Sequence, residues 1–321
     1  MAHTDIELII WTDSLQVSLA RQIIDQLKDR VTILAIGGPR QADVTDLARD
    51  FDLPFDDDLR KLMVDYPPTG LLLLSMLDVE MHDLEAAHEA QTAVHTINPV
   101  TSEIARANDV TVRCRLLPRF EQCAGWTQAA NPLESLGKIN QIHLTNMGQP
   151  NDGSLFARLV DSWELILSMK NLPTSVDAVI SSSSAIPESL SKISGHLAIQ
   201  ARLSGHECVQ MVLSDHGAVA QRQMTLLGQE AQLIVNDTQY KLYQPDGSII
   251  DQWSENSIMP SFAELVSEGW FTAMTNPYAQ AVDEALQVKR RKEALGCAHA
   301  CLISARTGES ETPSKVLELQ V

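Results

Sequence analysis

The sequence lacks the features that mark membrane, secreted and nucleic-acid-binding proteins. No apolar run approaches the roughly twenty residues that cross a bilayer, and no apolar segment follows basic residues near residue 1, so we expect neither a transmembrane helix nor a signal peptide. Lysine and arginine number 24 against 42 aspartates and glutamates, which gives a net charge of −18. Because nucleic acids and anionic membranes attract a positive protein face, we expect no partner of either kind.

Cysteine is also scarce. The five cysteines are an odd number with scattered spacing, which favours free thiols and a cytoplasmic protein over a disulfide framework. Cys297 and Cys301 are four residues apart on an expected helix and could face one metal ion. Structural zinc needs four ligands, so we favour small buried core residues over a metal site and predict no metal.

Residues 6–76 alternate apolar strands with amphipathic helices. The runs Ile6–Trp11, Val31–Ile36 and Leu71–Leu74 are typical of strands buried on both faces, and Val17–Leu27 and Ala42–Phe51 carry apolar residues at helical spacing. A parallel connection needs a crossover of about a dozen residues, and these helices supply it. The pattern predicts an α/β domain with a doubly wound parallel sheet of Rossmann type.

The same rhythm continues to residue 117, where we place the end of the first domain. We expect a helix over Asp83–Ala93, a strand over Val94–Ile97, a helix over Thr101–Asn108 and a strand over Val110–Arg113.

Residues 118–321 have a different rhythm, with strands in hairpin succession. Such a succession predicts an α+β domain with a large, open, mostly antiparallel sheet. The expected helices are Arg119–Ala130, Leu155–Met169, Ser261–Glu268 and Pro277–Ala305. The expected strands are one within Gly137–Asn146, then Thr174–Ser181, His196–Leu203, Cys208–Leu213, Gln221–Leu227, Glu230–Asn236 and Gln239–Tyr243.

This order of elements over nearly the whole chain resembles the Gfo/Idh/MocA oxidoreductases. Ala48–Asp57 is similar to the family's loop before its third helix, Gly228–Leu233 to its sheet turn, and Ala294–Gly308 to its final helix. The resemblance implies an NAD(P)-dependent dehydrogenase of sugar-like or cyclitol-like substrates. It also implies a homodimer or homotetramer assembled through the open sheet of the second domain.

The turn after the first strand departs from the family. Its glycine-rich G-x-G-x-x-G sequence, which lets main chain approach a diphosphate, is replaced by a bulky Trp11 and an acidic Asp13. A carboxylate there repels phosphates, and Asp13 or Ser14 is more simply interpreted as a helix N-cap. If a dinucleotide binds, the resemblance places it against Thr12, Asp13, Ser14, Leu15, Ser75 and Met76.

The second strand ends without the acidic residue that holds an adenosine ribose. Gly37, Gly38, Pro39 and Arg40 follow it instead. Arg40 could meet a 2′-phosphate, which favours NADP over NAD if a cofactor binds at all. The simpler interpretation is a surface arginine after a turn.

The family's catalytic positions are also changed. Its Glu-Lys-Pro sequence is similar to Ile97-Asn98-Pro99, so Asn98 stands where the lysine would, and an amide cannot act as a general acid or base. Its acid and histidine positions on the following helix carry Ala157 and Asp161, with Glu164 after them. Asp161 and Glu164 could form a carboxylate pair on one helix face. Alternatively, Arg158 pairs with Asp161 at the surface.

Two smaller groups of residues complete the candidates. Glu80 and His82 follow the third strand, where the resemblance places the nicotinamide, although a solvated loop histidine is the simpler interpretation. The basic residues 288–292 are expected to form a solvated helix face.

The changed positions leave two hypotheses. The chain is an NAD(P)-linked oxidoreductase with unusual residues, or it is a non-catalytic ligand-binding or scaffold protein that keeps the fold and the dimer surface. NADP or NAD, or no cofactor at all, is consistent with these hypotheses.

Overall fold

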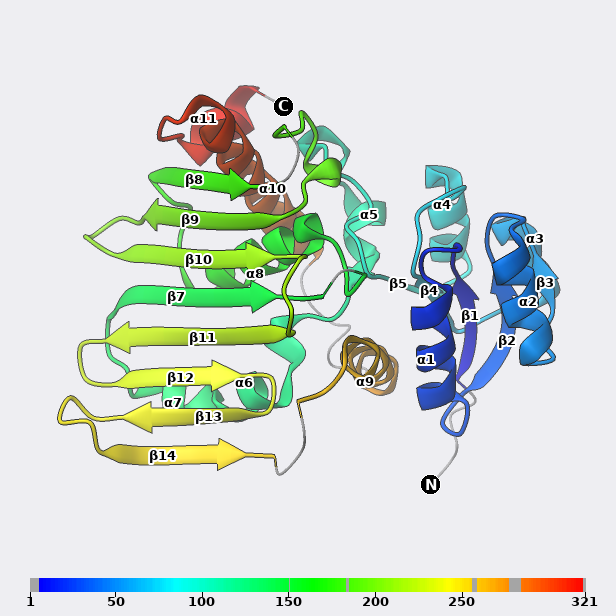
Figure 1. The fold of residues 1–321 in the computed structure, drawn as a ribbon, viewed down its shortest axis with the longest axis horizontal. Coiled ribbons are helices and arrows are strands. Elements are labelled where there is room, and N and C mark those ends of the chain that lie inside the picture. Colours follow the sequence, from blue (N-terminus) through cyan, green and yellow to red (C-terminus); the bar gives the residue numbers. More distant parts are fainter. Residues whose placement is uncertain (1–5, 150, 183–184, 256–258, 277–283, 320–321) are drawn as a thin grey trace. The chain divides into compact units, whose positions relative to one another are not determined.

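The computed structural model describes residues 6–149, 151–182, 185–255, 259–276 and 284–319 (Figure 1). The chain forms two compact units that interleave along the sequence. Unit 1 comprises Met1–Val100, Asn108–Pro118 and Phe262–Gln287, and unit 2 comprises Thr101–Ala107, Arg119–Ser261 and Val288–Val321. The functional division expected between residues 1–117 and 118–321 stays a prediction.

Unit 1 contains a six-stranded sheet in which every strand is parallel to its neighbours. The strand order is β3-β2-β1-β4-β5-β6. The strands are β1 (Glu7–Trp11), β2 (Thr32–Gly37), β3 (Phe55–Asp56), β4 (Gly70–Leu73), β5 (Ala93–Thr96) and β6 (Arg115–Leu116). The helices are α1 (Val17–Leu27), α2 (Ala42–Asp50), α3 (Leu59–Asp65), α4 (Met81–Glu89), α5 (Asp109–Arg113) and α9 (Phe262–Thr275). This arrangement confirms the Rossmann-type sheet.

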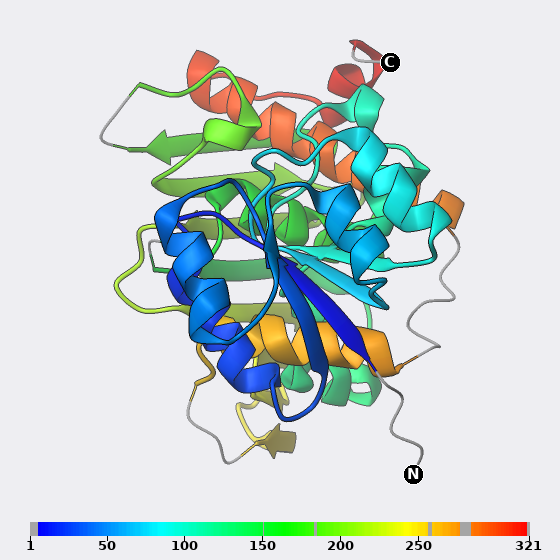
Figure 2. The same ribbon diagram turned by 90° about the vertical axis from the view of Figure 1, so that its right-hand side faces the viewer.

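Helices cover both faces of this sheet. Neighbouring residues of a strand point to opposite sides, and here the residues on both sides are apolar and need a covering helix. Leu8 and Ile10 of β1 pack in the core formed with α1, α2 and α9, whose Trp270 is fully buried there. Ile9 and Trp11 pack in the opposite core with α3 and α4. Figure 2 shows α9 (orange) beside α1 (blue) on one face of the sheet.

Unit 2 contains an eight-stranded sheet in the order β14-β13-β12-β11-β7-β10-β9-β8. All neighbours are antiparallel except β7 and β10, which run parallel. The strands are β7 (Ile139–Met147), β8 (Ser175–Ser181), β9 (His196–Arg202), β10 (Cys208–Ser214), β11 (Gln221–Gly228), β12 (Gln232–Asn236), β13 (Gln239–Tyr243) and β14 (Ile249–Ser254). The helices are α6 (Ala124–Gln128), α7 (Ala130–Glu134), α8 (Leu155–Met169), α10 (Glu284–Thr307) and α11 (Pro313–Leu319), with single 3₁₀ turns at Ile104–Arg106, Phe120–Gln122 and Leu190–Lys192.

One face of the unit 2 sheet is packed and the other is open (Figure 1). Along β9 exposed and buried residues alternate strictly, and the buried Val209, Met211 and Leu213 of β10 share the packed side with α8. Val212 points to the open side and is half exposed. The open, mostly antiparallel sheet is therefore confirmed. Among the described helices, none is both long and apolar enough to cross a bilayer.

The segment between the two sheets was predicted wrongly. Val110–Arg113 is not a strand but lies in α5, and the neighbouring strand is β6. Asn108 accepts a hydrogen bond from the Thr111 main-chain N–H at 3.0 Å, while Thr111 Oγ1 accepts one from Asn108 N–H at 3.0 Å. This capping box starts a helix at Asp109, which overrides the strand preference of the valines and threonine. Of the helix expected over Thr101–Asn108, only the 3₁₀ turn Ile104–Arg106 is present.

Other elements differ in extent. The helix expected over Arg119–Ala130 is broken into a 3₁₀ turn, α6 and α7. The short elements β3, α3, β14 and α11 were not predicted, and α9 runs beyond the expected Glu268. Of the helix expected over Pro277–Ala305, residues 277–283 lie outside the described residues.

Candidate functional site

The turn from β1 to α1 begins with a buried tryptophan. The Trp11 indole is fully buried and donates from Nε1 to the Leu77 carbonyl at 3.0 Å. A Cβ placed on Gly37, at the end of β2, would lie 2.5 Å from the Trp11 ring. The indole therefore fills the space between the ends of β1 and β2, and Gly37 is the residue that admits it.

The Asp13 carboxylate occupies the main-chain donors of this turn. Oδ1 accepts from the N–H groups of Leu15 at 2.9 Å and Gln16 at 3.3 Å, and Oδ2 accepts from the Ser75 hydroxyl at 2.5 Å. The Ser14 N–H donates to Gln41 Oε1 at 2.8 Å. Three consecutive N–H groups before α1 thus end on the protein's own side chains. The expected N-cap at Asp13 or Ser14 is wrong in position, because the N-cap of α1 is Gln16, which makes no side-chain capping bond.

Two features of this turn disfavour a dinucleotide diphosphate. Phosphate binds here in other proteins through unpaired main-chain N–H groups at the start of the helix, whereas the N–H groups of Ser14, Leu15 and Gln16, just before α1, already donate to Gln41 and Asp13. A diphosphate would also meet the like charge of the Asp13 carboxylate. The Asp13 carboxylate thus takes the place in this turn that the diphosphate of a dinucleotide would need.

Two other predicted cofactor residues, Thr12 and Ser75, make hydrogen bonds beside the same turn. Thr12 donates its N–H to the Gly37 carbonyl at 2.9 Å, and its own carbonyl would lie 1.9 Å from a Cβ on Gly38. Ser75 accepts from the Leu77 N–H at 3.1 Å, and Met76 packs against the core shared with α3 and α4. The structure brings these residues together; their role in cofactor binding stays a prediction.

Arg40 lies at the surface and pairs with Asp57 at 3.0 Å. A 2′-phosphate would have to compete with that carboxylate, although an exposed pair of this kind is weak. The NADP assignment of Arg40 therefore stays a prediction. His82 is bonded locally: its ring nitrogens lie 3.0 Å from Glu80 and 3.2 Å from Asp83 at the start of α4.

Asn98 follows β5 in unit 1. Its N–H donates to Thr96 Oγ1 at 3.0 Å, which fixes the main chain before the buried Pro99. An amide at this position can orient a polar group but cannot exchange a proton near neutral pH.

Asp161 and Glu164 of α8 lie at the centre of a buried charge cluster in unit 2. Both are at most 5% exposed. Glu164 contacts Arg291 of α10 and lies 3.5 Å from Arg119, which in turn lies 2.8 Å from Glu121. The expectation of a fully solvated basic face on residues 288–292 is wrong for Arg291, because its guanidinium is buried against Glu164.

The pKa values of the two carboxyl groups are shifted in opposite directions. Burial raises the pKa of Asp161 to about 6, against the opposing charges of Arg222 and Arg119. Burial also acts on Glu164, but Arg291 and Arg119 outweigh it and hold the pKa of Glu164 below its usual value. Of these two buried carboxyl groups, three residues apart on α8, Asp161 therefore has the raised pKa and Glu164 the lowered one.

The alternative of a surface pair between Arg158 and Asp161 is wrong. Arg158 is buried and donates to Asn146 Oδ1 at 3.1 Å and to the Asp152 carbonyl at 2.7 Å. Burial and the nearby Arg222 lower the pKa of Arg158 to about 10, so the guanidinium remains charged at neutral pH.

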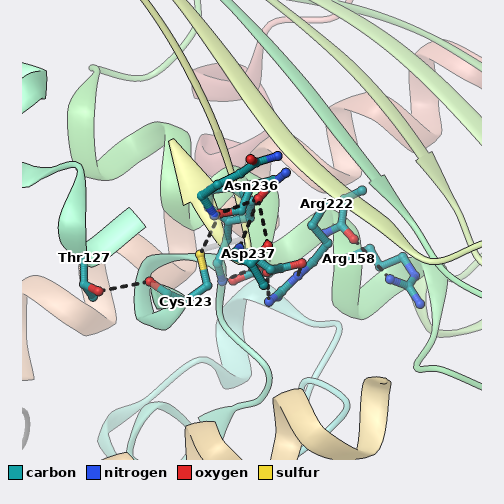
Figure 3. Close-up of polar contacts among 11 residues, drawn as sticks. Cys123, Thr127, Arg158, Arg222, Asn236 and Asp237 are labelled. Carbon is teal, nitrogen blue, oxygen red and sulfur yellow. Dashed lines mark hydrogen bonds and ion pairs between the residues drawn. The ribbon is translucent and has the colours of Figure 1, made fainter. Parts of the chain in front are cut away.

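Arg222 of β11 and Asp237 form a second buried ion pair in the same unit (Figure 3). Arg222 donates to Asp237 from Nε at 3.2 Å and from Nη2 at 2.5 Å. Beside them, the Cys123 thiol lies 3.7 Å from the Asn236 carbonyl, and burial raises the pKa of Cys123 to about 12. Sequence reasoning missed this pair because its members are fifteen residues apart, Arg222 on β11 and Asp237 in the bend after β12.

No cluster of three or more histidine, cysteine, aspartate or glutamate side chains able to hold a metal occurs among the described residues. Cys297 and Cys301 are buried in α10, and burial raises the pKa of both thiols, that of Cys301 to about 12. Their environment is that of core residues.

No protein-family model and no curated protein matches the sequence. Solved structures do match its fold. An Agrobacterium radiobacter oxidoreductase in complex with NAD+, L-tartaric acid and magnesium has a TM-score of 0.71 at 10% identity, over 97% of this chain and 99% of that one. A Corynebacterium glutamicum myo-inositol dehydrogenase has a TM-score of 0.67 at 13% identity, over 96% and 98%.

A Synechocystis biliverdin reductase in complex with biliverdin and NADP+ has a TM-score of 0.63 at 16% identity, over 94% of this chain and 99% of that one. The chain has the Gfo/Idh/MocA-type oxidoreductase fold. At these identities the likeness establishes the architecture alone, so the resemblance drawn from the sequence is confirmed as a resemblance of fold.

Proposed function

We propose that this protein is a catalytically degenerate relative of the NAD(P)-linked oxidoreductases that serves as a ligand-binding or scaffold protein. The observation that carries this proposal is the Asp13 carboxylate, which takes the main-chain donors of Leu15 and Gln16 in the turn where a diphosphate would bind. Asn98 adds support, because its amide cannot replace a titrating lysine.

A second candidate is an NAD(P)-linked oxidoreductase of a sugar-like or polyol-like substrate that uses unusual residues. It is favoured by solved structures of the same fold that hold NAD+ or NADP+. It is also favoured by Asp161, whose pKa of about 6 suits a general acid or base. In this interpretation Asp161 stands in for the missing histidine, Glu164 occupies the place of the family's last acid, and Arg40 selects NADP.

Titration with NADH and NADPH separates the two candidates. A ligand present at a hundred times its dissociation constant stabilises the folded state by about 2.7 kcal/mol, which a thermal shift detects. We expect no shift for the wild type with millimolar cofactor. A shift with quenched tryptophan fluorescence would refute the degenerate reading and support the oxidoreductase.

Two variants sharpen the titration. Asp13→Gly removes the internal anion and frees the N–H groups of the turn, so any gain in cofactor binding identifies Asp13 as the barrier. If the wild type binds, Arg40→Ala should weaken NADPH more than NADH, and equal losses would remove the assignment of Arg40.

We also propose that the open face of the unit 2 sheet mediates a homodimer or homotetramer. Val212 lies on this face and is 49% exposed, so Val212→Asp should dissociate the assembly. Val64→Asp in α3 is the matched control, because Val64 is 77% exposed in unit 1. Sedimentation that shows a monomeric wild type at micromolar concentration would contradict the proposal. The cytoplasmic location stays a prediction.

A further inference from the structure

Unit 1 contains a pocket of about 480 Å³ beside β5 and β6. Gln91 and Thr92, which line it, precede β5, and Arg113 and Cys114 precede β6. The β1–α1 turn instead follows its strand. Because the strands are parallel, the residues before β5 and β6 lie at the end of the sheet opposite to the β1–α1 turn. The volume falls in the range of small-molecule sites, and the place is not the one a dinucleotide would take.

The charged lining of this pocket is entirely cationic. Arg113 and Arg115 both line it, and no carboxylate occurs among its described lining residues. Arg113 Nη1 lies 2.7 Å from His88 Nδ1, and a guanidinium can only donate, so His88 Nδ1 accepts. In a chain with a net charge of −18, an acid-free wall with two guanidinium groups concentrates positive potential.

His95 adds a buried polar group without a partner. The residue is among those that line the pocket, its side chain is 1% exposed and lies edge-on to Trp270 with the ring centroids 6.3 Å apart, and neither ring nitrogen has a hydrogen-bond partner within the described part of the chain. Burial and the charge of Arg115 lower the pKa of His95 to about 3, so the ring is neutral. A neutral imidazole can donate one hydrogen bond and accept another, and a buried polar group left unsatisfied is costly.

The remaining wall is apolar. Leu84 of α4, Val94 of β5 and Val110 of α5 face the same space. Cationic and apolar lining together match an amphipathic ligand rather than a bare inorganic ion.

We propose that this pocket binds a small organic anion, a carboxylate or phosphate monoester with an apolar body. Arg113 and Arg115 hold the charged group and Leu84, Val94 and Val110 contact the body. Each guanidinium carries five donors, so it can bind a ligand oxygen alongside a partner within the protein. The inference stands independently of the proposed function, because the pocket lies away from the β1–α1 turn.

Isothermal titration with three matched probes tests the proposal. Benzoate, phenyl phosphate and benzyl alcohol share one ring and differ in charge. We expect benzoate or phenyl phosphate to bind in the millimolar range or tighter and the neutral alcohol to bind at least tenfold more weakly, and the stronger of the two anions identifies the class. Equal binding of all three, or no binding of either anion, would overturn the proposal.

Variants locate the binding. Arg113→Gln and Arg115→Gln should each weaken the anion by about tenfold or more, since a hydrogen bond to a charged group is lost. Arg49→Gln is the control, because Arg49 is an exposed arginine of the same unit, paired with Asp46 on α2. Val110→Phe fills the pocket without removing charge and should also abolish binding. Undiminished binding in Val110→Phe and in whichever arginine variant folds would place the anion elsewhere.

Discussion

Replacing Asp13 with alanine tests whether the internal anion stabilises the β1–α1 turn. The carboxylate accepts two main-chain N–H groups at 2.9 and 3.3 Å and the Ser75 hydroxyl at 2.5 Å. A hydrogen bond to a charged group contributes about 1.5–3 kcal/mol, and removal of an N-cap costs about 0.5–2 kcal/mol. Asp13 is half-buried, so water replaces part of the loss. We expect Asp13→Ala to lower the free energy of unfolding by about 2 kcal/mol.

Two further variants divide that loss. Asp13→Asn keeps an acceptor for the N–H groups but removes the charge, so it should cost about 1 kcal/mol or less. Ser75→Ala removes the third donor, and the double variant with Asp13→Ala should cost less than the sum of the single ones by about 1 kcal/mol, because the residues are bonded to each other.

Urea unfolding followed by tryptophan fluorescence and by far-UV circular dichroism measures these changes. Asp46→Ala is the control, because Asp46 is 51% exposed on α2 and makes only an exposed pair with Arg49. Exposed substitutions of this kind stay within about 0.5 kcal/mol. If Asp13→Ala is as stable as Asp46→Ala, or if Asp13 and Ser75 are additive, the bonded carboxylate does not hold the turn and the exclusion of diphosphate loses its basis.

Three other predictions concern buried groups. Arg222→Gln leaves the Asp237 carboxylate buried without its counter-charge and should cost about 3–5 kcal/mol in urea unfolding. His95→Phe removes the unpartnered ring nitrogens and should raise the free energy of unfolding of the ligand-free protein by about 1–2 kcal/mol; a loss of stability would show that both nitrogens are satisfied. Asp161 has a folded pKa raised to about 6, so the folded state binds the extra proton between the unfolded pKa and pH 6, and stability falls as pH rises through that window. Relative to Asp161→Asn, the wild type should lose about 2–3 kcal/mol between pH 4 and pH 7, and parallel pH profiles would contradict the shift.

The sequence predicted the sheets well because their strands carry a strong local signal. The apolar runs around Ile9 and Leu72 predict strands buried on both faces. The alternation of buried and exposed residues along β9 predicts a strand with one face in solvent. The errors fell where a side-chain contact decides the backbone. Val110–Arg113 has the composition of a strand, but the hydrogen bonds between Asn108 and Thr111 start a helix.

The candidate site was predictable only where it is local. Asp13 does bond the turn that precedes the helix, through Leu15 and Gln16, but the N-cap of α1 is Gln16, so the N-cap interpretation is wrong in position. The partners Gln41 and Ser75 come from other loops, and Arg291 reaches Glu164 from 127 residues away. Sequence spacing carries no signal for such contacts, which is why Arg291 was placed on a solvated face.

Phe262–Gln287 belongs to unit 1 although it follows most of unit 2 in the sequence. This limits which fragments of the protein can fold alone. Ala263, Val266 and Trp270 of α9 close the same core as Leu8 and Ile10 of β1. A fragment that stops at Pro118 would keep α1 and α2 on that face but expose the apolar residues that α9 covers, so it should aggregate rather than fold. An autonomous first half would instead require α9 to be joined to it by a linker, and the order of synthesis implies that this half cannot be completed on the ribosome until most of the second has emerged.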